Sequence, residues 1–173
     1  MRWRFAGLLL TCASAALAAP APSAVDQLSG RYSRQFPNGT VDGTRYTSED
    51  IVEIVKVDRD HAYVRLELQF FNGHTCGLTG VARAEGNALV YREPGEPDGS
   101  RQCVLRIARK ANQLGWDDGE DSCRAYCGAR GSFAEGRLPW ASKRPITYLA
   151  RLKRGPEYRT AIEEWRTGSK VLP

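Results

Sequence analysis

The sequence predicts a mainly β protein, in which an antiparallel meander forms a small barrel or sandwich and a C-terminal helix packs on it. Three observations lead to this prediction. Apolar and polar residues alternate along residues 62–71, which is the pattern of a strand with one buried face. Asn72-Gly73 follows directly and is typical of a tight turn between antiparallel strands. From Pro156 onward, apolar residues recur at helical spacing instead.

The first 18 residues have the features of an export signal. Two arginines precede an apolar stretch over residues 5–17, and Ala16-Leu17-Ala18 offers small residues where a signal peptidase reads them. This stretch is shorter than the about 20 residues needed to span a bilayer, and no later segment can span one either. We therefore expect a signal peptide over 1–18, no membrane span, and a periplasmic or secreted protein.

After the signal, residues 19–27 are rich in Ala and Pro and are expected to form a linker, with one domain over 28–173. That length is enough for one hydrophobic core but not comfortably for two. Charge is distributed unevenly: residues 137–173 hold nine Lys and Arg against three Asp and Glu, whereas residues 19–136 hold 14 against 17. The basic segment is either a solvated tail or a patch for an anionic partner.

Short strands separated by turns are expected through the domain. Residues 50–57 are rich in β-branched residues, and Asp58-Arg59-Asp60 forms a turn before the strand over 62–71. Further strands are expected over 87–93, 103–109 and 113–116, with a loop over 94–100.

The tail is expected to add a last strand over 146–152 and then a helix over about 156–167. Pro156 suits the first turn of a helix, and Gly168 is expected to end it. Tyr158, Ile162 and Trp165 share one face of this helix, which we expect to pack against the sheet.

The hairpin at Asn72-Gly73 determines the register of the two strands that it joins. Both residues tolerate the positive φ angles of a type I′ turn, so a two-residue loop that pairs Phe71 with His74 is expected. That register turns Cys76 and the residue two positions after it to the polar face, because a slip of one residue turns a whole strand over. We therefore expect a bulge near Gly77 that returns them to the apolar face.

The four cysteines that follow the signal are expected to form two disulfides at one end of the sheet: Cys76, Cys103, Cys123 and Cys127. An even number of cysteines after an export signal is typical of a disulfide framework. Three pairings are possible, and sequence alone cannot choose among them. A turn that joins residues four apart favours a bond between Cys123 and Cys127, which leaves Cys76 to bond Cys103.

Catalytic or metal chemistry finds little support. The cysteines with His74 could ligate zinc, but they lack paired Cys-x-x-Cys knuckles, and Cys-x-x-x-Cys is a poor match to a redox motif. The acidic run over 116–121 lacks the ligand pattern of a calcium loop. No histidine follows Ser132, which argues against a Ser-His-Asp hydrolase. We expect no catalytic activity, no cofactor and no metal.

Three stretches resemble small exported domains of Gram-negative bacteria, some of which are similar to lysozyme-inhibitor-like envelope proteins. They are Phe71 to Gly77, Cys103 to Ile107, and Cys123 to Gly131. The resemblance covers residues 30–133 and implies a compact β fold in the cell envelope. It transfers no inhibitory site, because the Ser and Lys loop motifs of C-type lysozyme inhibitors have no match here.

These observations favour a non-catalytic binding module, in its specific form an inhibitor of a cell-wall lytic enzyme such as a lysozyme. The candidate binding residues are Tyr126 and Arg130, with His74 nearby, because Tyr and Arg are frequent interface hot spots. The partner is then that enzyme or another envelope protein, and export argues against nucleic acid. The competing hypothesis is a lipocalin-like carrier with a small apolar ligand inside the barrel.

Overall fold

The computed structural model describes residues 22–95 and 101–170, so the expected signal peptide and residues 96–100 of the expected loop lie outside the described residues. The strands are β1 (Gly30–Gly39), β2 (Arg45–Lys56), β3 (His61–Gln69), β4 (Thr75–Glu85), β5 (Ala88–Arg92), β6 (Val104–Lys110), β7 (Gln113–Asp117) and β8 (Gly136–Pro139). The helices are α1 (Ala24–Leu28), α2 (Leu149–Arg154) and α3 (Pro156–Thr167), and single 3-10 turns form η1 (Phe71–Gly73), η2 (Arg124–Tyr126) and η3 (Trp140–Ser142).

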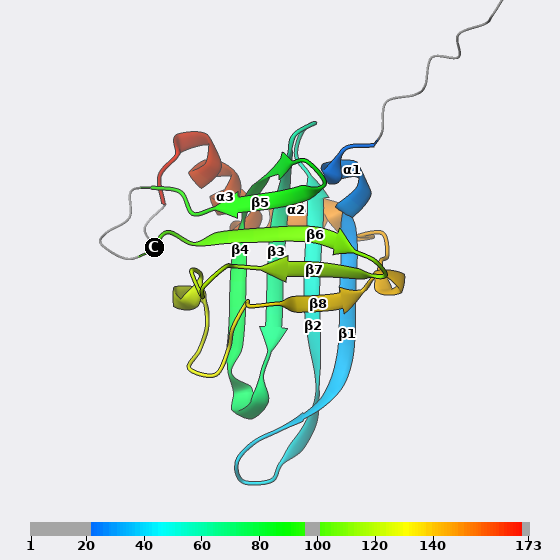
Figure 1. Ribbon diagram of the computed structural model, residues 1–173, viewed down its shortest axis with the longest axis vertical. Helices are drawn as coiled ribbons and strands as arrows, with labels where there is room; N and C mark the ends of the chain where they lie inside the picture. Colours follow the sequence, from blue (N-terminus) through cyan, green and yellow to red (C-terminus); the bar gives the residue numbers. More distant parts are fainter. Residues whose placement is uncertain (1–21, 96–100, 171–173) are drawn as a thin grey trace, which may run out of the picture.

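The described strands form one eight-stranded sheet in which each strand pairs antiparallel with the next along the chain. In Figure 1 strands β5–β8 lie across strands β1–β4, so the sheet curls over its own inner face. After β8 the chain continues to Arg144, which exchanges two backbone hydrogen bonds of 2.8 and 2.9 Å with Arg31 of β1. The result is a nearly closed barrel, and the expected fold class is confirmed.

Large side chains fill the inside of this barrel. The alternation along β3 is confirmed, because Ala62, Val64, Leu66 and Leu68 all face the main core and are at most 4% exposed. Aromatic rings from four parts of the chain join them in the same core, namely Tyr32, Tyr91, Trp116 and Phe133. Two glycines leave space for two of these rings, Tyr91 and Trp116. A Cβ atom at Gly80 would overlap the ring of Tyr91, and one at Gly136 would overlap Trp116.

The expected register of the β3–β4 hairpin is wrong by one residue. The loop contains the three residues of η1, and the backbone N–H of Phe70 donates to the carbonyl of His74 at 2.7 Å. Leu68 therefore pairs with Cys76, and the pairing continues without a bulge from Gln69–Thr75 to His61–Arg83. This register brings Cys76 to the inner face directly, so the bulge expected near Gly77 is not needed.

Two further expectations are corrected at the ends of the domain. Part of the expected linker over 19–27 is helix α1, in which Ala24, Val25 and Leu28 are buried in the main core. The strand expected over 146–152 is replaced by helix α2. Arg144 already occupies the edge of β1, so the chain beyond it lies on the outer face of the sheet, where a helix satisfies its own backbone.

Helix α3 confirms the helix expected over 156–167. Pro156 is its first residue, and it ends at Gly168, which has a φ of 68°. The helix packs on the outer face of the sheet, where the ring centroids of Tyr158 and Tyr63 lie 4.9 Å apart. No helix among residues 22–95 and 101–170 is both long and apolar enough to cross a membrane.

The cysteines form two disulfides, Cys76–Cys127 and Cys103–Cys123, so the framework is confirmed but the favoured pairing is wrong. Cys123 and Cys127 flank η2, and this turn directs them to different neighbours. Cys123 is fully buried against Cys103, whereas Cys127 forms a backbone bridge with Cys76 at the start of β4. We call these two bonds with residues 123–131 the disulfide pole.

We predict that Gly80→Ala lowers the free energy of unfolding by about 1–3 kcal/mol, which is the usual cost of overpacking a core. The added methyl group would overlap the buried ring of Tyr91. Urea unfolding followed by circular dichroism measures the change.

Gly77→Ala is the matched control, because it lies on the same strand with no atom within 4 Å of an added Cβ. Its effect should stay within about 0.5 kcal/mol. Equal losses of stability in both variants would contradict the tight packing of Gly80 on Tyr91.

Candidate functional site

Strands β1 and β2 extend beyond the rest of the barrel and carry their connecting turn away from it (Figure 1). Where they leave the barrel, the inner face changes from apolar to polar. Asp50 accepts a hydrogen bond from the backbone N–H of Gln69 at 2.9 Å and pairs with Arg34 at 3.0 Å. Ser48 accepts one from the side-chain amide of Asn38 at 2.9 Å. These satisfied polar groups mark the end of the core.

The turn of the β3–β4 hairpin lies beside this extension and is joined to it by hydrogen bonds. The side chain of Asn38 donates to the carbonyl of Phe70 at 3.0 Å, and the side chain of Asn72 accepts from Val41 N at 3.3 Å. The hydroxyl of Tyr46 accepts from Gly73 N at 3.1 Å. We call this double hairpin, residues 36–46 and 69–73, the hairpin pole.

The turn at its tip is ordered by its own polar groups. Asp42 accepts hydrogen bonds from the hydroxyl of Thr40 and from the backbone N–H of Thr44, and these bonds lower the pKa of its carboxyl group. Thr40 N donates to the carbonyl of Thr44 at 2.9 Å, and Gly43 adopts a φ of 90° that favours glycine. The tip thus holds a defined shape while its side chains face outward.

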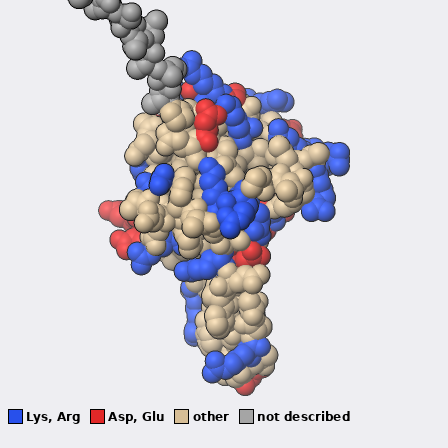
Figure 2. All heavy atoms as spheres, turned by 90° about the vertical axis from the view of Figure 1, so that its right-hand side faces the viewer, with Lys and Arg blue, Asp and Glu red and all other residues tan. Residues whose placement is uncertain are grey.

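Apolar side chains are exposed at the hairpin pole. Among the described residues, four large hydrophobic side chains are exposed, and three of them lie here: Val41 at 73%, Phe71 at 46% and Tyr46 at 36%. Asp42 and Arg45 are its only charged residues, and in Figure 2 the projection is mostly tan. A hollow of about 530 Å³ lies alongside, lined by Phe36, Pro37, Asn38, Gly39, Thr40, Gly43, Thr44, Arg45, Gln69, Phe70 and Phe71.

Two of the three binding residues expected from the sequence, Tyr126 and Arg130, lie in the disulfide pole, and the third, His74, lies beside it. Tyr126 is half-buried, and its hydroxyl donates to Glu93 at 2.8 Å and lies 3.4 Å from the hydroxyl of Tyr91. Burial raises the pKa of Tyr126, so its hydroxyl keeps its proton for this bond. Lys170 lies over the same ring at 5.1 Å and pairs with Glu93. Tyr126 is therefore engaged within the protein.

Arg130 and His74 lie near the surface of the same pole. Arg130 is exposed and forms no hydrogen bond or ion pair with any described residue. The loop carbonyls are bound instead by Arg124, which donates to Gly131 at 2.5 Å and to Ala129 at 2.9 Å. His74 lies against Gly128, where an added Cβ would come within 3.2 Å of its Nδ1 atom. Of the three expected residues, Arg130 is exposed, whereas Tyr126 and His74 are partly buried.

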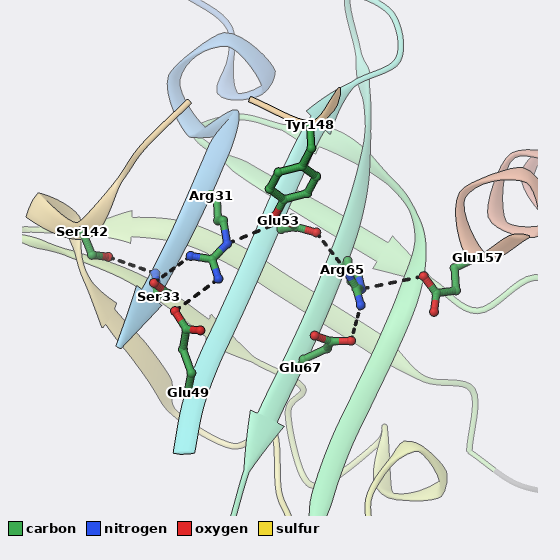
Figure 3. A network of polar contacts seen from close by, with 9 residues as sticks. All are labelled: Arg31, Ser33, Glu49, Glu53, Arg65, Glu67, Ser142, Tyr148 and Glu157. Carbon is green, nitrogen blue, oxygen red and sulfur yellow. Dashed lines mark hydrogen bonds and ion pairs between the residues drawn. The ribbon is translucent and has the colours of Figure 1, made fainter. Parts of the chain in front are cut away.

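A buried carboxylate on the outer face of the sheet forms the centre of a polar network (Figure 3). The side chain of Glu53 is 1% exposed and lies between Arg65 at 3.2 Å and Arg31 at 3.9 Å on the neighbouring strands. Tyr148 covers it and donates its hydroxyl to Glu53, and burial followed by this bond raises the pKa of Tyr148. Glu157 of α3 also reaches Arg65. The network fastens the C-terminal segment to the barrel.

Sequence reasoning missed both the hairpin pole and this network. The turn residues Pro37-Asn38-Gly39 and Asp42-Gly43 around an isolated Val41 are the local signal that could have indicated an exposed apolar tip. For Glu53 the signal is an acidic residue inside the β-branched run over 50–57. Tyr148, which covers Glu53, is 95 positions away in the sequence, so only the structure shows that Glu53 is buried.

Comparison with known proteins does not assign a role to any of these sites. No family model, no curated protein and no solved structure matches the chain. Within the described part of the chain, no three His, Cys, Asp or Glu residues are grouped so that they could hold a metal ion. The four cysteines weighed as zinc ligands are bonded to each other in pairs. The functional argument therefore depends on the surfaces described above.

We predict that Tyr148→Phe lowers the free energy of unfolding by about 1.5–3 kcal/mol, the range for a hydrogen bond to a charged group. The buried carboxylate of Glu53 would lose the hydroxyl that covers it. Urea unfolding at neutral pH measures the effect.

Tyr158→Phe serves as the control for loss of a tyrosine hydroxyl from the same C-terminal segment. The hydroxyl of Tyr158 forms no hydrogen bond within the described residues, so a change within about 0.5 kcal/mol is expected. The account of the network fails if Tyr148→Phe is as stable as the unmodified protein.

Proposed function

We propose that the protein is a non-catalytic binding module of the bacterial envelope that inserts its hairpin pole into the cleft of a protein partner. One observation carries this proposal: three of the four exposed large hydrophobic side chains of the described chain gather on one projecting double hairpin. Clusters of exposed apolar side chains on a projecting surface mark interaction sites. The two disulfides fit an extracytoplasmic location, where thiols are oxidised.

The shape and charge of the hairpin pole suit a concave partner. Its tip is fixed by hydrogen bonds before any partner arrives, so little conformational entropy is lost on binding. Tyr46 and Phe71 are of the aromatic types enriched at protein interfaces, and Val41 lies beyond them at the tip. With only Asp42 and Arg45 charged, insertion into a cleft removes few charges from water.

The specific partner that we propose is a cell-wall lytic enzyme, which the protein inhibits by occupying its glycan-binding cleft. Such a cleft is long and open enough to accept a hairpin. Many of these enzymes are cationic, and the basic residues 137–154 of this protein would repel them at long range. In Figure 2 the blue spheres gather mainly on the body above the projection. Contact through the hairpin pole keeps that repulsion small.

The carrier hypothesis gains no support from the inside of the barrel. The rings of Tyr32, Tyr91, Trp116 and Phe133 lie there, each at most 3% exposed. Gly80 and Gly136 lack the side chains that would compete with two of these rings for the space. A lipocalin-like ligand needs that volume, so the outer surface is the better place to expect binding.

We predict that residues 19–173 inhibit peptidoglycan hydrolysis by at least one class of lysozyme at micromolar concentration. Val41→Asp and Phe71→Ala should each raise the inhibitory concentration about tenfold or more, which corresponds to about 1.4 kcal/mol of binding free energy. Loss of turbidity of a cell-wall suspension measures the inhibition.

Leu149→Asp is the matched control for an exposed apolar residue away from the hairpin pole, at 38% exposure on α2, and should leave inhibition unchanged. Loss of inhibition in Arg130→Ala, but not in the hairpin variants, would place the binding site at the disulfide pole. If lysozymes of several classes stay fully active at micromolar excess, the inhibitor function is excluded.

A further inference from the structure

The basic C-terminal segment lies against the barrel and forms a charged surface. Residues 137–154 hold six Lys and Arg and no Asp or Glu: Arg137, Lys143, Arg144, Arg151, Lys153 and Arg154. Within residues 22–95 and 101–170, none of these six forms an ion pair with a carboxylate. Figure 2 shows Lys and Arg gathered on this side of the body. Of the two possibilities left open by the sequence, the patch is the one the fold supports for this segment.

One cation of this segment, Lys143, shares an aromatic ring with Arg109 of the barrel. The guanidinium of Arg109 lies 4.4 Å from the ring centroid of Trp140, and the Nζ atom of Lys143 lies 5.1 Å from it. Arg109 comes from β6, whereas Trp140 begins η3 and Lys143 follows it. A backbone hydrogen bond holds η3 against the turn between β6 and β7, because the N–H of Trp140 donates to the carbonyl of Asn112 at 2.8 Å.

The cations at this ring are held close together without a negative partner. Arg109 donates to the carbonyl of Ala111 at 3.1 Å, and Lys143 donates to the carbonyl of Gln27 at 2.5 Å. Both acceptors are neutral. Burial, and then the nearby charge of Arg109, lower the pKa of Lys143. A bound anion would relieve the repulsion between these two side chains.

A polar hollow lies next to Arg109. It has a volume of about 450 Å³ and is lined by Gln27, Asn87, Arg109, Ala111 and Asn112. Its three side-chain amides can both donate and accept hydrogen bonds, which suits hydroxyl groups. The combination of a cation pair and an amide-lined hollow fits a phosphate ester whose other substituent carries hydroxyls.

We propose that Arg109 and Lys143 bind the phosphate of an anionic lipid headgroup, with the headgroup hydroxyls in the adjacent hollow. Lys110 and Arg144 follow the two residues of the pair in the sequence and are exposed, and Arg151, Lys153 and Arg154 of α2 are exposed as well. An array of lipid phosphates engages several such cations at once, whereas a single soluble phosphate cannot. This site is separate from the hairpin pole and does not depend on the proposed inhibition.

The test is flotation of the mature protein with vesicles of phosphatidylglycerol in phosphatidylcholine, compared with vesicles of phosphatidylcholine alone. Binding should require phosphatidylglycerol and should weaken between about 0.1 M and about 1 M salt, because the Debye length falls from about 10 Å to about 3 Å. The double variant Arg109→Gln with Lys143→Gln should lower vesicle binding about tenfold or more. Lys143→Arg, which keeps the charge, should retain binding.

Arg83→Gln with Arg106→Gln is the matched control, since it removes the same charge from two exposed strand residues near Glu85. It should bind vesicles as the unmodified protein does. Thermal unfolding by circular dichroism confirms that each variant is folded. Equal losses in both double variants, or equal binding to uncharged vesicles, would overturn the site. Binding of glycerol 3-phosphate in calorimetry without vesicle binding would overturn the lipid as its ligand.

Discussion

The pairing of Leu68 with Cys76 is the constraint on which the rest of the structure depends. It turns Cys76, Leu78 and Ala82 of β4 into the core, where each is at most 1% exposed. With Gly80 between them on the same face, the ring of Tyr91 finds room against the strand. A slip of one residue would replace this inner face with Thr75, Gly77 and Thr79. The core would then lose the apolar side chains of β4, and the barrel would lose its disulfide to the loop over 123–131.

The same register connects the core to both the disulfide pole and the hairpin pole. With Cys76 inward, its sulfur bonds Cys127 and anchors the disulfide pole. With a three-residue loop in place of a two-residue one, Phe71 leaves the barrel and lies against the neighbouring hairpin. Asn72, in a left-handed conformation with a φ of 62°, then accepts the hydrogen bond from Val41. The exposed apolar tip is thus a consequence of how the core is paired.

Features set by local sequence could be predicted, and features set by distant contacts could not. Helix α3 begins at Pro156 and ends at Gly168, and both signals are local. Strands β2, β3, β5, β6 and β7 confirm those expected from local patterns, whereas the disulfide pairing depends on which strands η2 brings together. The residue type of Tyr126 indicates a binding residue, but only the fold shows that Glu93 and Lys170 engage it. Likewise, Val41 and Phe71 become one surface only after two hairpins meet.

Nuclear Overhauser effects between α-protons across β3 and β4 test the register most directly. The account predicts contacts of Glu67 with Gly77 and of Gln69 with Thr75, which face each other in the structure. Contacts of Leu68 with Gly77 and of Phe70 with Thr75 would instead report the two-residue hairpin, because these residues face each other without exchanging hydrogen bonds in that register. That result would contradict the placement of Cys76 in the core and of Phe71 at the hairpin pole, and with it the proposed binding surface.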